Sequence, residues 1–243
     1  MSSRKEIKLT KELAKRLQSK FPDSRIYANK CPSRAKRIKE AWNDNFNEVC
    51  PPLQPEIDLI FLDTLSENNP TLRAVEIKYF ERKRERVSQS FYKGIEQSLA
   101  LLQWGFDSVA LWQLFDESIS VSEIKNYGCR TWFYVQGVLG LPLDFTPIRL
   151  VPRENGLGFQ VVQSDWRNYF SPIWLNDIDS PGFNIRWRND NPLAHEQLRR
   201  ERFRDMLANP DTRPLFERMF SEVDMKRNFL LSWLPEQERN LGI

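Results

Sequence analysis

Two apolar segments separated by a turn constrain the fold of this chain most strongly. EIDLIFLD (56–63) and LRAVEIKYF (72–80) are rich in β-branched and aromatic residues, and the TLSENNPT between them is typical of a turn. The pattern predicts two neighbouring strands. Both carry charge where a buried strand should carry none: Asp58 lies near the start of the first, and Glu76 and Lys78 lie inside the second.

Strand geometry sorts these side chains by face. Because successive side chains point to opposite faces of a sheet, Glu76 and Lys78 point the same way, and Val75, Ile77 and Tyr79 point the other way, into the core. Burying either charge unpaired is costly, and a mutual salt bridge recovers only part of that cost. A hairpin with one solvent-exposed face would explain the charges without any chemistry.

A divalent cation offers the other explanation. Magnesium prefers hard oxygen ligands and keeps several of its waters, so two carboxylates and a backbone carbonyl suffice to bind it. Asp58 can approach Glu76 across the predicted hairpin. Asp63 is the rival ligand, but it stands five positions after Asp58, so strand alternation places it on the opposite face, beside the turn. We therefore favour a metal site that contains Asp58 and Glu76.

The segment before the hairpin predicts a helix and a short strand. Leu9, Leu13 and Leu17 recur every four residues within 4–20, which indicates an amphipathic helix. RIYAN (25–29) is a candidate strand. The following basic segment is compatible with either a charged helix or a loop over residues 33 to 48.

The segments after the hairpin alternate between helix and strand. Residues 88–104 predict a helix that Gly105 ends, and DSVALWQLF (107–115) predicts a buried strand. A helix between strands favours an α/β sheet covered on both faces. A further helix is predicted over 120–139, and two strands around a RENGLG turn over 145–163.

The tail is predicted to be helical and charged. One helix is expected over 192–207, followed by two shorter helices with NPDTRP and FSEVD as the interruptions.

Composition excludes several classes of protein. The 243 residues are 40% apolar and 28% charged, as in ordinary globular proteins, and a net charge of +3 does not by itself indicate a polyanionic partner. The cysteines are Cys31, Cys50 and Cys129, none in a CxxC, which argues against a disulfide framework or a four-cysteine metal site. A single histidine, His195, does not suffice for histidine-based metal sites or triads, and no P-loop is present.

The same sequence gives an expectation for cellular location. No segment approaches the roughly 20 apolar residues that a membrane span needs. The charged start MSSRKEIKLTKELAKRL lacks the apolar core of a signal peptide. We expect a cytoplasmic protein with free thiols and no membrane contact.

The hairpin resembles that of the PD-(D/E)xK nuclease superfamily, which has the restriction-endonuclease-like fold. The resemblance is carried by PEID (55–58), EIK (76–78), the spacing between them, and the helix and strand that follow. It covers roughly residues 4–115. It departs from the family pattern in one place, because two residues separate Pro55 from Asp58.

The resemblance implies a role for each residue of the motif. Asp58 and Glu76 would ligate Mg²⁺ or Mn²⁺, and the Ile77 carbonyl would complete the protein's share of the ligands. Lys78 would orient and help deprotonate the attacking water, or stabilise the charge that develops on the phosphate. The product would be a hydrolysed phosphodiester.

Many members of the superfamily also place a glutamate on the first helix, facing the site. Glu6 shares the helix face of Leu9 and Leu13, whereas Glu12 lies on a charged face, so we assign this role to Glu6. A capping box with Ser3 is the alternative explanation for Glu6.

Two sets of residues are candidates for nucleic-acid binding. Lys93 and Gln97 are spaced to share one face of the predicted helix, and Gln97 resembles a glutamine of RecB-like branches, although Leu101 stands where those branches carry tyrosine. A polar rim on a half-buried helix would explain them equally well. The ERKRER run, with Arg82, Lys83 and Arg84, follows the motif directly and is either a phosphate-gripping segment or a solvated run.

We therefore expect an α/β protein with a restriction-endonuclease-like mixed central sheet flanked by helices and a mainly helical C-terminal addition. The predicted divisions are a nuclease core over 1–118, a helix and β-hairpin extension over 119–191, and a helical region over 192–243. The expected function is that of a Mg²⁺-dependent endonuclease, with DNA as the preferred substrate. The alternative is a non-catalytic nucleic-acid-binding or assembly protein of the same fold.

The sequence leaves the finer questions open. It does not distinguish DNA from RNA, or duplex, junction, flap and single strand. It also leaves open the recognition sequence, the pathway, the role of the C-terminal region, a homodimer, and a further subunit that supplies specificity. A homodimer would suit paired cuts in a duplex.

Overall fold

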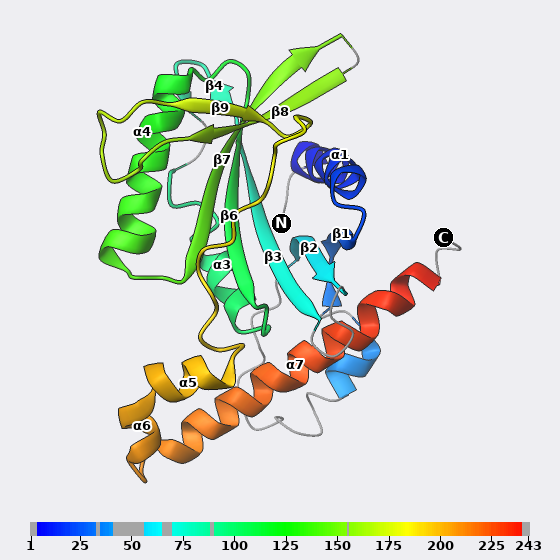
Figure 1. Cartoon of the computed structure of the whole chain (residues 1–243), viewed down its shortest axis with the longest axis vertical. Coiled ribbons are helices and arrows are strands. Elements are labelled where there is room, and N and C mark those ends of the chain that lie inside the picture. Colours follow the sequence, from blue (N-terminus) through cyan, green and yellow to red (C-terminus); the bar gives the residue numbers. More distant parts are fainter. Residues whose placement is uncertain are drawn as a thin grey trace.

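The computed structural model describes residues 4–32, 35–40, 56–64, 70–87, 90–154 and 156–239. The strands are β1 (Ser24–Lys30), β2 (Ile57–Asp63), β3 (Thr71–Phe80), β4 (Arg82–Lys83), β5 (Arg86–Val87), β6 (Ser108–Phe115), β7 (Leu143–Arg153), β8 (Gly156–Gln163) and β9 (Trp174–Asp177). Seven of them form one mixed sheet in the order β1-β2-β3-β6-β7-β8-β9 (Figure 1). The central strands β3, β6 and β7 are parallel, and the outer pairings are antiparallel.

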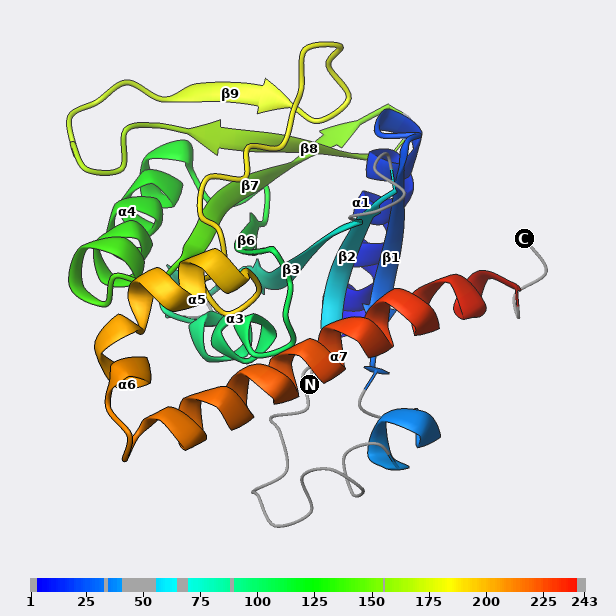
Figure 2. The same cartoon turned by 60° about the horizontal axis from the view of Figure 1, so that its bottom comes forward.

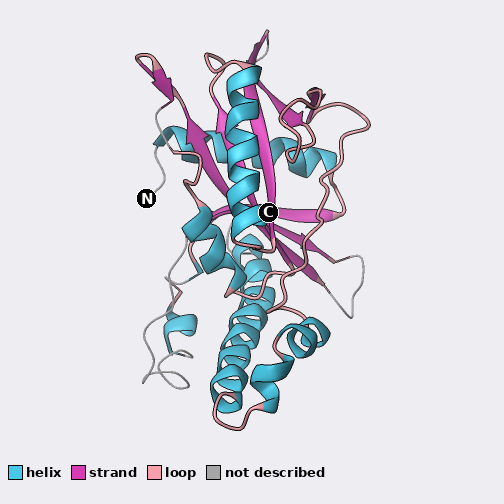
Figure 3. Cartoon of the chain, turned by 90° about the vertical axis from the view of Figure 1, so that its left-hand side faces the viewer, coloured by secondary structure: helices cyan, strands magenta, loops and turns pink. Residues whose placement is uncertain are grey.

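Helices cover both faces of this sheet. They are α1 (Arg4–Lys20), α3 (Ile95–Leu102), α4 (Val121–Trp132) with its π-helical end η2 (Phe133–Val138), α5 (Glu196–Arg202), α6 (Arg204–Ala208) and α7 (Arg213–Arg239). Helix α1 packs on one face, and α3, α4 and α7 pack on the other (Figures 1 and 2). Helices α5, α6 and the start of α7 gather beyond one end of the sheet (Figure 3). The chain is thus an α/β protein with a helical C-terminal segment.

The alternation of β3 separates two apolar cores. Val75 and Ile77 pack with Leu13 and the other apolar residues of α1. On the opposite face, Leu72 and Ala74 pack with residues of α3 and α7. Because β3 and β6 are central and buried on both faces, β6 is apolar except for Ser108 and Gln113, whereas β3 interrupts its apolar residues with Glu76 and Lys78.

Most predicted elements are confirmed. The first helix spans 4–20 as expected, the two acid-bearing segments form the antiparallel pair β2 and β3, and the region 120–139 is helical. Strands β7 and β8 form the hairpin expected over 145–163. Of the segment 33–48, the structure describes only residues 35–40, so its conformation as a whole stays a prediction.

The predicted start of the helix over 88–104 is wrong. Helix α3 begins at Ile95 and is preceded by a turn over 90–94. The helix cannot begin before Gly94, because the φ of that residue is 96°. This value lies in the left-handed region, which glycine tolerates and a regular helix does not use. Gly105, with φ 73°, follows the last turn of α3 as expected.

The prediction for the tail is also corrected. The single helix expected over 192–207 is interrupted at Phe203, whose ring packs 5.4 Å and 5.6 Å from the rings of Phe216 and Phe220. The two shorter helices expected after it are one helix, α7, and the FSEVD segment lies inside it because Phe220 and Val223 form a buried stripe. Strand β9 was not predicted, since two of its four residues are exposed, the other two are half-buried, and they lack an alternating pattern.

No helix among the described residues has both the length and the apolar character to cross a membrane.

Asn191 fastens the segment before α5 to the sheet. Its side-chain nitrogen donates to the carbonyl oxygens of Leu102 and Phe106, each at 2.8 Å, and its backbone nitrogen donates to Asp107 at 2.8 Å. The side chain is fully buried. This side-chain amide therefore connects the loop between α3 and β6 to the segment that precedes α5.

We expect Asn191→Ala to lower the free energy of unfolding by about 2–4 kcal/mol, because two buried carbonyl oxygens lose their donor. Denaturant titration measures the change. The control is Asn184→Ala, which changes an exposed residue of the same segment and should stay within about 0.5 kcal/mol of the wild type. Equal effects of the two substitutions would contradict the fastening role.

Candidate active site

The candidate site lies in a fork where β2 leaves β3. Their last pair on this side is Leu59 with Val75. Beyond it, β2 continues beside β1, with Ile57 paired to Lys30, while β3 continues beside β6 as far as Phe80. In the part of the chain that the structure describes, the edge of β3 from residue 76 to residue 80 therefore has no strand on its β2 side.

Two carboxylates take the place of the missing strand. The backbone nitrogen of Ile77 donates to Asp58 Oδ2 at 2.7 Å, and that of Tyr79 donates to Glu6 Oε2 at 2.9 Å. Buried backbone N–H groups must find acceptors, so these acids satisfy the strand edge. Glu6 is 3% exposed on the apolar face of α1, as the helix pattern predicts.

Lys78 connects the acids within the fork. Its ammonium donates to Glu76 Oε1 and to the Ile77 carbonyl, the latter at 3.0 Å, and lies 3.8 Å from Glu6 Oε1. Gly94 lets the lysine stem lie against the start of α3, because a Cβ there would come within 2.8 Å of Lys78 Cγ. The motif residues thus converge on one small volume.

Burial sets the electrostatics of this cluster. Asp58, Glu76 and Lys78 are 1%, 0% and 4% exposed. The pKa of Asp58 is raised to about 7 and that of Glu76 to about 8. Loss of water is the main cause, the nearby carboxylates add to the rise, and Lys78 opposes it. Burial alone would lower the pKa of Lys78, but the attraction of Glu76, Asp58 and Glu6 outweighs it and raises that pKa.

Two buried oxygens in the fork have no hydrogen-bond partner among the described residues: Asp58 Oδ1 and Glu76 Oε2. Buried carboxylate oxygens are costly when unpaired. Together with the Ile77 carbonyl they form a hard oxygen donor set of the kind that suits Mg²⁺ or Mn²⁺. The residues present therefore fit a divalent cation that keeps several waters.

The fit rests on two carboxylates. Within the described ranges, no group of three or more His, Cys, Asp or Glu side chains could hold a metal ion. A cation here would depend on Asp58, Glu76, one carbonyl and solvent. In the present arrangement, Lys78 supplies the positive charge.

The structure separates the predicted site residues from their rivals. Asp63 lies at the far end of β2, where Ser24 and Arg73 donate to its carboxylate, so it does not reach the fork. Glu12 pairs with Arg16 at 3.0 Å on the outer side of α1. Asp58 and Glu6 are thus the acids that meet Glu76 and Lys78.

The candidate nucleic-acid residues are dispersed. One guanidinium nitrogen of Arg82, Nη2, donates to both carboxylate oxygens of Glu123, at 2.6 Å and 2.7 Å. Lys83 pairs with Glu81, and Arg84 stands exposed at the β4–β5 turn. Exposed Lys93 precedes α3, so it does not share a helix face with half-buried Gln97. Their contact with nucleic acid stays a prediction.

Sequence reasoning missed Gln113. It lies opposite Lys78 on β6 and is fully buried. Its amide donates to the Phe91 carbonyl at 2.8 Å, and Thr131 donates to the same carbonyl at 2.9 Å. Gln113 therefore anchors the turn that covers Lys78. A glutamine in the otherwise apolar strand VALWQLF was the available signal.

Comparison with protein-family models, with curated proteins and with solved structures finds no match to this chain.

The raised carboxyl pKa values predict an unusual dependence of stability on pH. The folded chain holds protons on Asp58 and Glu76 up to about pH 7–8, whereas the unfolded chain releases them near the ordinary values of 3.8 and 4.5. Stability from these groups is therefore fully present below the ordinary values and is lost as the pH rises through the folded values. Without divalent cations, we expect the free energy of unfolding to fall by a few kcal/mol between pH 5 and 8.

Denaturant titration at several pH values tests this expectation in wild type and in Asp58→Asn/Glu76→Gln. The double variant should lose the decline, because it lacks the two carboxyl groups whose pKa values burial raises. Glu201→Gln, which removes an exposed carboxyl from α5, is the control and should keep it. The same decline in wild type and double variant would show that these two acids ionise normally.

Proposed function

We propose that this chain is a metal-dependent nuclease of the restriction-endonuclease-like type that hydrolyses phosphodiester bonds, with DNA as the preferred substrate. One observation carries the proposal: two buried carboxylates present unpaired oxygens beside a lysine in a strand fork. A chain gains little stability from such an arrangement. A divalent cation would satisfy those oxygens.

The order of elements supports the same fold family. Helix α1 precedes three antiparallel strands, and α3 then leads into β6, which lies parallel to β3. This helix-strand-strand-strand-helix-strand order is what the motif resemblance implies. The motif residues also lie together at the fork.

Each residue has a chemical task in the proposal. Mg²⁺ or Mn²⁺ held by Asp58, Glu76 and the Ile77 carbonyl would polarise the scissile phosphate and lower the pKa of a bound water. Lys78 stands at the same carbonyl and can donate to the phosphate oxygen on which negative charge develops. Glu6 would position Lys78, because its carboxylate accepts from the Tyr79 backbone nitrogen on the edge of β3 and lies beside the Lys78 ammonium.

Burial favours a second candidate, a non-catalytic nucleic-acid-binding or assembly protein of the same fold. Lys78 pairs with Glu76 and the cluster is closed to solvent, so the charges can serve as a structural network. In the nuclease, a phosphodiester must displace the cover of this cluster before cleavage. The turn over 90–94, which Gln113 and Thr131 anchor, forms part of that cover.

Partners follow from the proposed chemistry. One site cuts one strand, so cleavage of a duplex at both strands would use two copies of the chain or two successive encounters. Exposed Lys93 and Arg84 are the candidate phosphate contacts, whereas Arg82 would first have to leave Glu123. A further subunit could supply sequence specificity.

We expect wild-type protein to cleave DNA with Mg²⁺ or Mn²⁺ and not with EDTA. Glu76→Gln should lower the rate at least about a hundredfold by removing a ligand charge, and Lys78→Ala should do so by removing an electrostatic contact. Supercoiled plasmid, linear duplex and single-stranded DNA serve as substrates. The exposed Glu201→Gln and Lys39→Ala are matched controls and should keep wild-type rates.

The outcomes separate the two candidates. Metal-dependent cutting that both site variants lose, with folding intact by circular dichroism, supports the nuclease. DNA binding without cutting under all metal conditions supports the binding protein. Cutting that survives both substitutions would show that the fork is not the catalytic site.

A further inference from the structure

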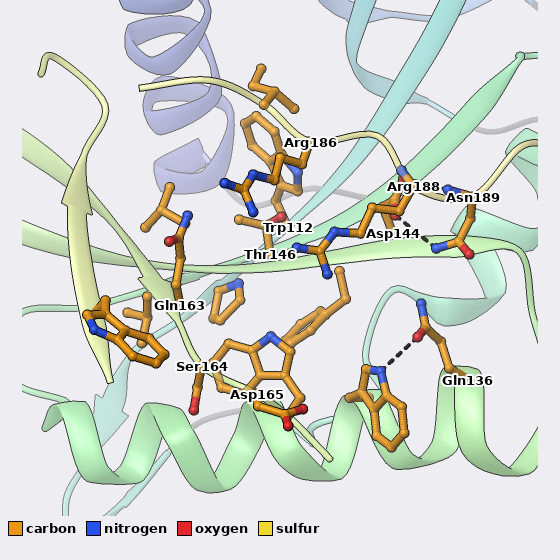
Figure 4. Close-up of a pocket in the computed structure, with 18 of the residues that line it drawn as sticks. Trp112, Gln136, Asp144, Thr146, Gln163, Ser164, Asp165, Arg186, Arg188 and Asn189 are labelled. Carbon is orange, nitrogen blue, oxygen red and sulfur yellow. Dashed lines mark hydrogen bonds between the residues drawn. The ribbon is translucent and has the colours of Figure 1, made fainter. Parts of the chain in front are cut away.

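A second fork opens between β7 and β8. Their last pair on this side is Ile148 with Val161. From there β7 runs back to Leu143 beside β6 only, while β8 runs on to Gln163 beside β9. The fork holds a cavity of about 610 Å³, within the range of roughly 300–1,000 Å³ that is usual for small-ligand sites (Figure 4).

The cavity is unusually rich in indole rings. Four tryptophans of the described residues line it, from β6, α4, the loop after β8, and β9. They are Trp112, Trp132, Trp166 and Trp174. Such rings offer planar apolar surface to an aromatic ligand.

An extended segment presents two arginines to the cavity. In the segment 183–189, Ile185 and Trp187 pack toward the core, so Arg186 and Arg188 point the other way. Trp187 lies edge-on to Phe61 of β2, with ring centroids 5.7 Å apart. Figure 4 shows both guanidinium groups on one side of the cavity.

Asp144 holds this segment in place. Its carboxylate accepts from the backbone nitrogen of Arg188 at 3.0 Å and from the side chain of Asn189 at 2.8 Å. The other acid that lines the cavity, Asp165, pairs with Arg167 at 3.0 Å. Neither Arg186 nor Arg188 forms a salt bridge with a described residue. The charge of Arg188 acts on Asp144 at longer range and lowers the pKa of that carboxyl against the effect of burial, so Arg186 offers the freer charge to an anion.

Trp112 supplies a hydrogen-bond donor without an acceptor. The residue is 2% exposed, and its Nε1 has no hydrogen-bond partner in the described part of the chain. Thr146 lies beside it in register on β7 and also lines the cavity. A buried donor of this kind is costly unless a ligand or water accepts from it.

We propose that the cavity binds a nucleotide. The base stacks on indole rings, the phosphate contacts Arg186 and Arg188, and a base or sugar oxygen accepts from Trp112 Nε1. In a nucleic acid, the occupant is a nucleotide unstacked from its neighbours, as in single-strand recognition. Only this assignment to a nucleic-acid substrate rests on the proposed nuclease function.

Calorimetric titration of the full chain with deoxyadenosine monophosphate, and separately with deoxyadenosine, tests the proposal. The monophosphate should bind at least tenfold more tightly than the nucleoside, because only it can contact the arginines. Arg186→Ala/Arg188→Ala should remove most of this difference. Trp112→Phe, which keeps an aromatic ring, should weaken binding of both ligands by about three- to tenfold.

Matched variants separate these effects from loss of fold or general charge. Arg200→Ala/Arg218→Ala removes two exposed arginines from α5 and α7 and should bind like wild type. Thermal unfolding of every variant verifies the fold. Absence of monophosphate binding at millimolar concentration, or equal binding by the two arginine double variants, would overturn the proposal.

The two proposals fail separately. Asp58→Asn/Glu76→Gln should bind the monophosphate like wild type, since its changes lie at the β2–β3 fork. Binding in a chain that does not cleave DNA would leave the nucleotide cavity standing without the nuclease. Cleavage in a chain that binds no nucleotide would do the reverse.

Discussion

The hydrogen bond from the Ile77 backbone to Asp58 is the contact on which the rest of the site depends. It lets β3 continue after β2 has turned away, because a carboxylate supplies the acceptor that the departed strand would have supplied. Glu6 does the same two residues later. The opening between the strands therefore carries acids for a structural reason. One of them, Asp58, also brings an oxygen without a hydrogen-bond partner among the described residues next to Glu76 and Lys78.

Charge balance decides what this opening can do. Three buried carboxyl groups face one ammonium, and burial makes further ionisation costly. Protons neutralise the excess at low pH, and a divalent cation would neutralise it at neutral pH. The proposed catalyst and the proposed structural network thus differ in which cation neutralises the carboxylates at neutral pH, a divalent metal ion in the first and Lys78 in the second.

The sequence predicted those parts of the fold that strand and helix periodicity control. Strand alternation correctly predicted that Glu76 and Lys78 lie on the same face of β3. The four-residue spacing of leucines correctly predicted that Glu6 lies on the buried face of α1. The sequence did not predict that α3 begins only after Gly94, because the need for a residue without a Cβ there comes from the close approach of Leu111 and Lys78, which are distant in sequence. The role of Gln113 and the β7–β8 cavity were not predicted either, since both depend on contacts between segments far apart in the chain. Periodicity also could not show that the site would be closed to solvent.

At both forks, neighbouring strands of the sheet stop pairing, and buried polar atoms there have no hydrogen-bond partner among the described residues. The most direct test of the central claim is a crystal soaked in Mn²⁺ and measured for anomalous scattering. We expect a peak about 2.1 Å from Asp58 Oδ1, Glu76 Oε2 and the Ile77 carbonyl oxygen, and its loss in Asp58→Asn/Glu76→Gln. A wild-type crystal without a peak in the fork, and with Lys78 still paired to Glu76, would contradict a metal site.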